Sequence, residues 1–553
     1  MLSKNNRKEQ LLKQEPKKQR FTIKKLTIGV ASVLIGFTFM GMNASADATT
    51  DTHSNTANQE AIQTNIDSGS KTLNNEQTNS FNSVANGSTN NTVSNDANNQ
   101  NLVTSQGIDQ NKIVQNTTTE PTQNSQVQSV SDYSQFLNAL QSDNVSTIKL
   151  NQNIDFSNAN LNNGSYQDIN NYGIARTITI DGQNQYALNM GNNYIDLDSN
   201  TYYEPNASNP TRNWNVILKD LNLQTTSGYG PFWFNSATSN DSTLTFNGVT
   251  TSKDSGQLLN NSTASSYPNV NVNFEGQNKL QGSLNNSNIT SSALIQANNV
   301  NFSNGSTVFT VNNNSSSDLA DIEASGNVVV DGSAQVDFNS EATSNMAGIS
   351  FAEGGAGNQT IDNATSGVLR LMPNAQVTME LGSGASMGVN NASNLDLQDN
   401  SSLKITTSKM NSTGFRSAGL VGLDYDGDTN DSTVRISPNA VLSVIRTNVT
   451  NSDAPLLAMG PNSGNGEIYH LEVNSGSLNL QDSAYSSFLP SSYTLSKSQY
   501  SGGWPAILTM WGTSSQNYLN FNNAKLINLQ RTAPNKPGYL IKTEGAGDYA
   551  YHQ

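Results

Sequence analysis

The chain of 553 residues carries a net charge of -15 and contains no cysteine. It therefore holds no disulfide, no thiolate metal site and no cysteine nucleophile, and its acidity argues against nucleic acid, whose phosphates it would repel. Only 13% of the residues are charged and 34% are hydrophobic. Asn, Ser, Thr and Gly make up the difference, which is typical of a β protein with many polar turns.

Residues 1–46 have the three parts of an export signal. Basic residues end at Lys25, an apolar run follows from Leu26 to Met42, and Ala44-Ser45-Ala46 supplies a cleavage pattern of small residues. We expect cleavage there, after which residues 47–553 carry a net charge of -22 and no membrane span. The alternative is a retained anchor, because an apolar run of about 17 residues is near the lower limit for crossing a bilayer.

Residues 21–25 read Phe-Thr-Ile-Lys-Lys, and Gly29 and Ser32 follow them. This segment resembles the YSIRK-G/S signal of Gram-positive surface proteins, with Phe for Tyr, Thr for Ser and Lys for Arg. The resemblance implies secretion to the bacterial cell surface. Such proteins usually end in an LPXTG motif, a hydrophobic segment and a basic tail, and residues 547–553 have none of these. We therefore expect a longer chain, or a protein that is released or held non-covalently.

Residues 47–126 consist mainly of Asn, Ser, Thr and Gln, with Phe81 as the only aromatic residue. A segment of this kind buries too little apolar surface to offset the entropy of ordering, which is about 1–2 kcal/mol per residue for the backbone. We predict a disordered spacer. Its density of Ser and Thr leaves a glycosylated stalk as the alternative.

A short helix is predicted at the start of the next region, residues 127–553. Ser131 or Asp132 can cap it, and apolar residues follow at helical spacing: Tyr133, Phe136, Leu137 and Leu140. After this helix the helical period nearly vanishes. From here on the sequence repeats one phrase, as in residues 299–311. The phrase consists of two or three alternating apolar residues, a polar turn with Gly or Asn, and a second alternating set.

The repeated phrase predicts an all-β, right-handed parallel β-helix. Its later copies recur at intervals of 26 to 48 residues, as expected for stacked coils with insertions of variable length. The period of two gives each strand one buried and one exposed face. A β-sandwich is the rival fold, and it would need hairpin turns every 8–12 residues. The predicted helix would cap the N-terminal end of the coils.

Residues 127–545 resemble the pectate-lyase-like adhesive domain of lactobacillus-type surface proteins. The resemblance is carried by four phrases, at residues 131–140, 145–154, 176–182 and 528–532. It implies a β-helix and an adhesive role.

We assess catalysis by searching the sequence for the motifs of hydrolases and lyases that share this fold. Hydrolases need clustered carboxylates, and their Asp-Asp, Gly-His-Gly and Arg-x-Lys phrases are absent from the sequence. A Ser-His-Asp triad would depend on His470 almost alone. A lyase needs a basic residue beside calcium-binding acids, but Arg176, Arg370 and Arg435 each lie within a strand phrase, where we expect solvated side chains. We predict that the protein is not an enzyme.

One acidic cluster is a candidate calcium site, with no other cofactor predicted. Oxygen ligands at alternating positions around Gly427 suit a hard cation, and the spacing differs from that of an EF-hand. The alternative is a solvated loop. The candidate ligands are Asp424, Asp426, Asp428, Asn430 and Asp431.

Aromatic residues are the candidate contacts for carbohydrate, because sugars stack on exposed rings. Trp214 opens a strand phrase, so we expect it to be buried. The rings that we assign to insertions, or to a second group near the C-terminus, are the candidates: Tyr202, Tyr203, Trp233, Trp504 and Trp511.

These features together predict a secreted or surface-displayed adhesin that binds an extended polymer without cleaving it. The expected partners are host or plant glycans or mucus components, although an anionic surface disfavours unaided binding of polyuronates and acidic mucins. Two alternatives stay open. One is a lyase or hydrolase acting on pectin-like polymers, and the other is self-association between cells.

Overall fold

All the residues that the computed structural model describes belong to the unit 113–553. The predicted signal peptide and all but the last residue of the predicted spacer lie outside the described residues. No helix in the described part is long and apolar enough to span a bilayer. The described ranges are 126–157, 168–171, 175–197, 213–234, 242–260, 270–342, 345–352, 361–364, 366–382, 385–408, 420–423, 431–447, 455–460, 468–483, 506–510, 516–531, 539–543 and 550–552.

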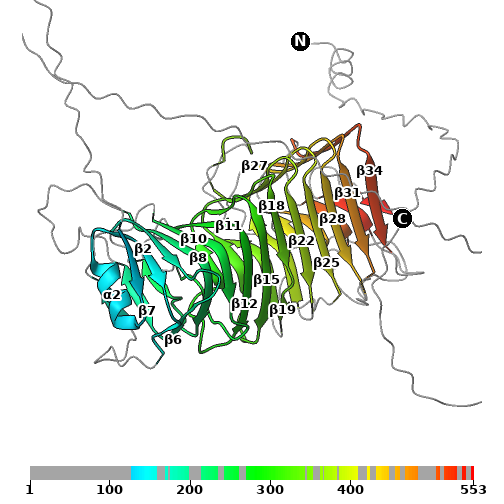
Figure 1. The fold of residues 1–553 in the computed structure, drawn as a ribbon. Coiled ribbons are helices and arrows are strands. Elements are labelled where there is room, and N and C mark those ends of the chain that lie inside the picture. The colour runs from blue at the N-terminus through cyan, green and yellow to red at the C-terminus, as the bar shows by residue number, and fades with distance from the viewer. Residues whose placement is uncertain are drawn as a thin grey trace, which may run out of the picture. The chain divides into compact units, whose positions relative to one another are not determined.

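The unit is a parallel β-helix, as predicted, and not a β-sandwich. Most coils place one strand on each of three faces, and these strands pair in parallel with the equivalent strands of the neighbouring coils. Figure 1 shows this stacking along the labelled strands β22, β25, β28, β31 and β34. Crossover connections between parallel strands are right-handed in nearly all proteins, which is the hand that we expected.

The first two faces form one 24-stranded sheet, because β8 and β10 bend and run through both. The first face holds β1 (Gln126–Val130), β2 (Val145–Leu150), β5 (Thr177–Asp181), β8 (Asn215–Thr225), β10 (Thr243–Thr251), β11 (Asn271–Glu275), β14 (Val300–Phe302), β17 (Val328–Val330), β21 (Val368–Leu371), β24 (Asn394–Leu397), β27 (Asp431–Ile436), β30 (Ile468–Asn474) and β33 (Tyr518–Asn522).

The second face holds the ends of β8 and β10 together with β3 (Ile154–Asp155), β6 (Ala187–Gly191), β12 (Gln277–Leu284), β15 (Gly305–Asn313), β18 (Ala334–Phe338), β19 (Glu341–Ala342), β22 (Gln376–Leu381), β25 (Ser402–Thr407), β28 (Val441–Arg446), β31 (Ser477–Asp482) and β34 (Leu526–Arg531).

The third face consists of a three-stranded and a nine-stranded sheet. All its pairings are parallel except that of β35 with β36. The strands are β4 (Asp168–Asn171), β7 (Tyr194–Leu197), β9 (Phe232–Phe234), β13 (Ala293–Ala297), β16 (Leu319–Ala324), β20 (Asn345–Phe351), β23 (Ala385–Ala392), β26 (Val421–Leu423), β29 (Leu457–Met459), β32 (Ala506–Met510), β35 (Tyr539–Thr543) and β36 (Ala550–His552).

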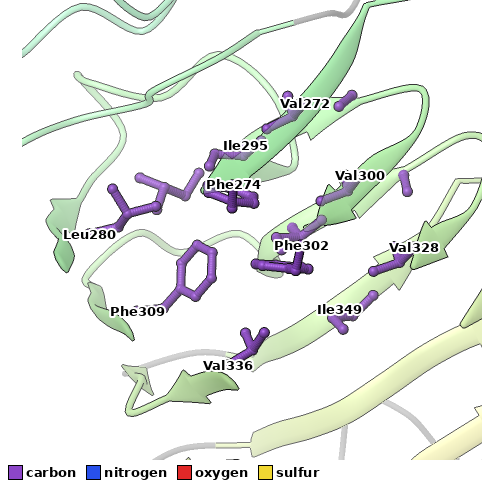
Figure 2. Packing of buried hydrophobic residues seen from close by; sticks show 14 of the residues in the cluster. Val272, Phe274, Leu280, Ile295, Val300, Phe302, Phe309, Val328, Val336 and Ile349 are labelled. Atoms are coloured by element: carbon purple, nitrogen blue, oxygen red, sulfur yellow. The ribbon is translucent and has the colours of Figure 1, made fainter. Parts of the chain in front are cut away.

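Stacked apolar side chains fill the interior. Because the strands pair in register, one residue type can repeat directly above itself. Phe246, Phe274 and Phe302 form such a column, with ring centroids 5.4 and 4.6 Å apart. Phe309 stacks on Phe338 at 4.7 Å on the second face. Figure 2 shows Phe274, Phe302 and Phe309 meeting inside the coil with Ile295 from the third face.

Asparagine side chains join successive coils at the start of the first face. The Oδ1 atom of Asn271 accepts the backbone N–H of Asn299 at 3.3 Å, and Oδ1 of Asn299 accepts that of Asn327 at 2.9 Å. Asn327 in turn accepts the N–H of Val368 at 3.0 Å. Each amide oxygen thus satisfies a backbone donor of the following coil, which gives part of the high Asn content a structural role.

The predicted helix is present as α2 (Tyr133–Gln141), at the N-terminal end of the stack (Figure 1). Asp132, rather than Ser131, is the N-cap residue, and its carboxylate accepts the N–H of Gln135 at 2.8 Å. The helix buries Phe136, whose ring meets the edge of Phe156 at 5.6 Å. This packing covers the first coil, as we expected.

Candidate binding face on the third face of the coil

A row of polar and aromatic side chains follows the outer side of the third face from coil to coil. In β7 and β9, Asp196 pairs in register with Trp233. Further along, Gln296, Glu323, Ser350 and Asn390 pair in register across β13, β16, β20 and β23. We call these residues, with Asn260 between the two groups, the third-face row. Asn260 lies level with Gln296, because the N–H of Gln296 donates to Leu259 O at 2.9 Å.

An aromatic cluster lies at one end of this row. Trp233 points outward and is half-buried, because its neighbours Phe232 and Phe234 point inward and are buried in the core. Its ring centroid is 4.5 Å from that of Tyr229 and 5.6 Å from that of Tyr194. Tyr194 is 7% exposed and also contacts Tyr229, at 5.1 Å. Two half-buried rings therefore rest on a buried third ring.

The segment that carries Tyr229 is fixed by two glycines packed against the next coils. A Cβ atom on Gly230, whose φ is +81°, would lie 2.6 Å from Leu258 O. A Cβ atom on Gly228 would lie 2.7 Å from Cγ2 of Thr290. Only glycine permits this close approach, so the backbone on both sides of Tyr229 holds the ring in place before a ligand arrives.

Thr290 connects the aromatic cluster to the polar residues that follow. Its hydroxyl donates to Gly228 O and accepts from Nδ2 of Asn260 at 2.7 Å. Its backbone N–H donates to Oε1 of Gln257 at 3.2 Å. Gln257 is fully buried and its Nε2 also donates to Ala293 O at 3.0 Å. The buried amide of Gln257 thereby holds both Thr290 and Ala293.

A polar cluster of Ser292, Gln296 and Glu323 comes next. The Ser292 hydroxyl donates to Oε2 of Glu323 at 2.6 Å, and Nε2 of Gln296 donates to Oε1 of the same carboxylate at 2.7 Å. Gln296 is 7% exposed. Its own Oε1 is buried and accepts no hydrogen bond from the residues that the structure describes.

The row continues with two further polar side chains, Ser350 and Asn390. Nδ2 of Asn390 donates to the Ser350 hydroxyl at 3.0 Å. A second row of buried residues runs parallel to it and forms a cluster separate from the main core: Ala293, Ala320, Ala347 and Met387. Adjacent strands in a sheet are about 4.8 Å apart, so the hydrogen-bonding groups recur at that interval along the stack.

This arrangement combines stacking surfaces with hydrogen-bonding groups, which is the chemistry that sugars require. The rings offer apolar faces, and the Ser, Asn and Gln side chains offer donors and acceptors for hydroxyl groups. A linear polymer lying along the stack would meet these groups in succession. The arrangement suits binding over several units of a polymer.

Of the five predicted carbohydrate contacts, Trp233 lies in this site, on a strand of the third face rather than in an insertion. Tyr202, Tyr203, Trp504 and Trp511 lie outside the described residues. Trp214 is fully buried against the guanidinium of Arg176, which is 5.4 Å from its ring centroid, so its predicted packing role is confirmed. Sequence reasoning did not select Gln296 or Glu323, because an isolated Gln or Glu carries no motif.

The candidate calcium ligands are described only in part. Asp424, Asp426, Asp428 and Asn430 lie outside the described residues, and Asp431 begins β27. Within the described residues, no three His, Asp or Glu side chains are grouped to hold a metal ion. Calcium binding stays a prediction.

The strand arginines are engaged in contacts, so the expectation of freely solvated side chains was wrong. Arg176 is buried and donates to Leu140 O at 2.9 Å and to Val145 O at 2.8 Å. Arg370 and Arg435 flank Asp396 across β21, β24 and β27, and each Nε donates to its carboxylate at 2.9 Å. Because Asp396 is buried, its negative charge needs these partners.

These ion pairs bear on catalysis. Burial raises the pKa of Asp396, but the hydrogen bonds and charge of Arg435 outweigh that effect and lower it below the ordinary value. A carboxylate held ionised in this way is a poor proton donor, and the two guanidiniums are occupied. His470 stacks on the ring of Tyr518 with centroids 4.0 Å apart. None of these groups has the arrangement of a catalytic acid and base.

Residues 127–259 match the family described as "Putative pectate lyase-like adhesive domain", and residues 17–41 match the YSIRK type signal peptide. The aromatic cluster lies within the matched part. The Ser292, Gln296 and Glu323 cluster lies beyond it. Comparison with curated proteins finds no match.

Two solved structures are similar, both of proteins titled SRRP from Lactobacillus reuteri. The SRRP of strain 100-23 is 13% identical, with 76% of this chain and 98% of that chain covered and a TM-score of 0.33. The SRRP of strain 53608 is 17% identical, with 73% and 99% covered and a TM-score of 0.29. The protein is thus a secreted protein of the bacterial cell surface, with a YSIRK-type signal peptide at residues 17–41 and a match to the pectate lyase-like adhesive domain over residues 127–259.

Proposed function

We propose that this protein is a cell-surface adhesin that holds an extended glycan along the third-face row and leaves its bonds intact. The family match and the signal peptide support an adhesin at the cell surface. The glycan and its place on the molecule are our proposal. The observation that carries it is the preformed stack of Tyr194, Tyr229 and Trp233, next to hydrogen-bonding side chains in register.

The stack favours binding for an energetic reason. The two outer rings are ordered by the ring of Tyr194 beneath them and by the glycines on both sides of Tyr229, so little side-chain entropy remains to be lost when a ligand binds. A pair of aromatic rings contributes about 0.5–1.5 kcal/mol beyond the area that it buries, which stabilises the stack itself. Several sugar units bound in succession can reach useful affinity although each contact is weak.

The test is retention of the protein on immobilised glycans before and after removal of a ring. We expect Trp233→Ala and Tyr229→Ala each to weaken binding by about tenfold, the equivalent of about 1.4 kcal/mol. Tyr518→Ala is the matched control, because its partly exposed ring lies on the first face. Unchanged retention by both site variants would contradict this placement of the glycan.

Absence of turnover is tested separately. Purified protein is incubated with pectins and mucins, with and without calcium, while reducing ends and unsaturated products are measured. Formation of either product by the wild-type protein would establish the lyase or hydrolase alternative. Self-association between cells stays a prediction, and clumping of protein-coated beads in the absence of any glycan would support it.

A further inference from the structure

The polar cluster of Ser292, Gln296 and Glu323 combines hydrogen-bond acceptors with a negative charge, and this combination distinguishes neutral from acidic glycans. We infer that it is a subsite for hydroxyl groups of an uncharged sugar, so that the protein prefers neutral polysaccharides to polyuronates. This inference rests on the proposed function and specifies its ligand class.

The orientation of the Gln296 amide is determined by its neighbour. A carboxylate only accepts hydrogen bonds, so the group 2.7 Å from Oε1 of Glu323 must be the Nε2 donor of Gln296. The amide oxygen therefore points away from Glu323. It is buried and accepts no hydrogen bond from a described residue.

An unsatisfied buried acceptor is costly, at about 1–3 kcal/mol. The cost is recovered when a ligand supplies a donor, and a sugar hydroxyl is one. Glu323 can also accept hydrogen bonds from a ligand, because a carboxylate has about four lone-pair positions. Ser292 and Gln296 use one position on each oxygen. The subsite therefore presents acceptors to its ligand.

The charge of the subsite excludes acidic sugars. Glu323 takes part in none of the ion pairs among the described residues, so no cation of that part of the chain offsets its charge. A uronate placed here would bring a second acceptor beside the first and would meet like charge. A neutral sugar offers only hydroxyls, which can donate to both Gln296 Oε1 and Glu323.

The experiment compares each polymer with its own charged derivative. Soluble β-glucan, galactan and mannan are immobilised as they are and after oxidation at C6 to the uronate, and binding of the full chain is measured at fixed ionic strength. We expect the wild-type protein to bind a neutral form at least about tenfold more tightly than its oxidised form, a difference of about 1.4 kcal/mol.

Two variants assign the preference to the subsite. Gln296→Leu removes the unpaired acceptor and should weaken binding of the neutral polymer by about tenfold. Glu323→Gln removes the charge and should narrow the difference between neutral and oxidised forms. Glu275→Gln is the matched control, since Glu275 is an outward carboxylate on β11 that accepts from Nδ2 of Asn247 at 3.1 Å. Thermal unfolding of each variant confirms that it is folded.

The outcomes separate the subsite from the proposed function. Tighter binding of an oxidised polymer by the wild-type protein, or a Glu323→Gln variant that discriminates like Glu275→Gln, would overturn the inference. If Trp233→Ala still loses binding in that case, the proposed function stands. Failure of the wild-type protein to bind any of the polymers would overturn both.

Discussion

Arg446 and Asp482 form a bidentate ion pair in the interior of the β-helix. Nε of Arg446 donates to Oδ1 of Asp482 at 2.8 Å, and Nη2 donates to Oδ2 at 2.6 Å. Both side chains are 1% exposed. They pair in register across β28 and β31, on the same inward side as Val444 and Leu480. The ion pair thus lies directly beside the apolar column that Val444 and Leu480 continue.

Removal of one member of this pair should destabilise the protein strongly. In Asp482→Asn the buried guanidinium of Arg446 loses the negative charge of this carboxylate, and we expect a loss of about 3–5 kcal/mol. The double variant Arg446→Met with Asp482→Leu should lose much less, because it buries no charge. Chemical denaturation measures both. A single variant as stable as the double variant would show that the pair is not desolvated as described.

Arg176 joins the capping helix to the first coils. Its guanidinium donates to Leu140 O at the end of α2 and to Val145 O in β2. Arg176→Met leaves these carbonyls without that donor, and we expect a loss of about 2–4 kcal/mol with faster hydrogen exchange in α2. Arg176→Lys should restore only part of the stability, because an ammonium cannot reproduce the planar geometry of several donors. Exchange in α2 that stays at the wild-type rate would contradict this role.

The fold was predictable where the physical signal was local. Alternating pairs such as Ile178 and Ile180, or Leu244 and Phe246, each lie on the inward side of a first-face strand, as their period of two predicts. The third face had no such signal, because strands such as β13 and β26 are buried at every position. Strands in which most residues on both sides are apolar lack the alternation of polar and apolar residues that reveals a strand.

Strand register limits prediction of the site. Trp233 was found because tryptophan is rare and its ring suits sugars. Glu323 and Gln296 gain their meaning from register, since residues 27 positions apart in the chain become neighbours only when β13 and β16 pair. No single-sequence pattern gives that register when the insertions between strands vary in length.

Asn374 lies in a turn that joins the first face to the second, and its substitution tests the backbone conformation of that turn. Its φ is +73°, a left-handed conformation that costs most residues about 1–2 kcal/mol but that asparagine and glycine adopt readily. Asn374→Ala should therefore lose about 1 kcal/mol, while Asn374→Gly should stay within a few tenths of the wild-type value. Equal stabilities of the alanine and glycine variants in urea denaturation would contradict a backbone origin.

Asp321 is a further buried aspartate, and unlike Asp396 and Asp482 it forms no ion pair with a described residue. It is fully buried in β16, and the Ser340 hydroxyl lies 3.0 and 2.8 Å from its two carboxylate oxygens. No ion pair of the described residues includes it. Burial raises the pKa of Asp321 well above its ordinary value of 3.8, and the hydrogen bond from Ser340 only partly opposes this effect.

The raised pKa predicts how stability depends on pH. Below pH 3.8 the carboxyl group is protonated in both the folded and the unfolded state. As the pH rises above that value, the unfolded state ionises first and its free energy is lowered, so the stability contributed by Asp321 falls until the folded-state pKa is passed. Asp321→Asn removes this loss while keeping a group that can bond to Ser340.

We therefore expect Asp321→Asn to raise the melting temperature at pH 7 and to change it much less at pH 3.5. Asp337→Asn is the control, because Asp337 is an outward residue of β18 whose neighbours in register are Val308 and Thr378. A melting temperature of Asp321→Asn that exceeds the wild-type value equally at both pH values would show that packing, rather than ionisation, causes the difference.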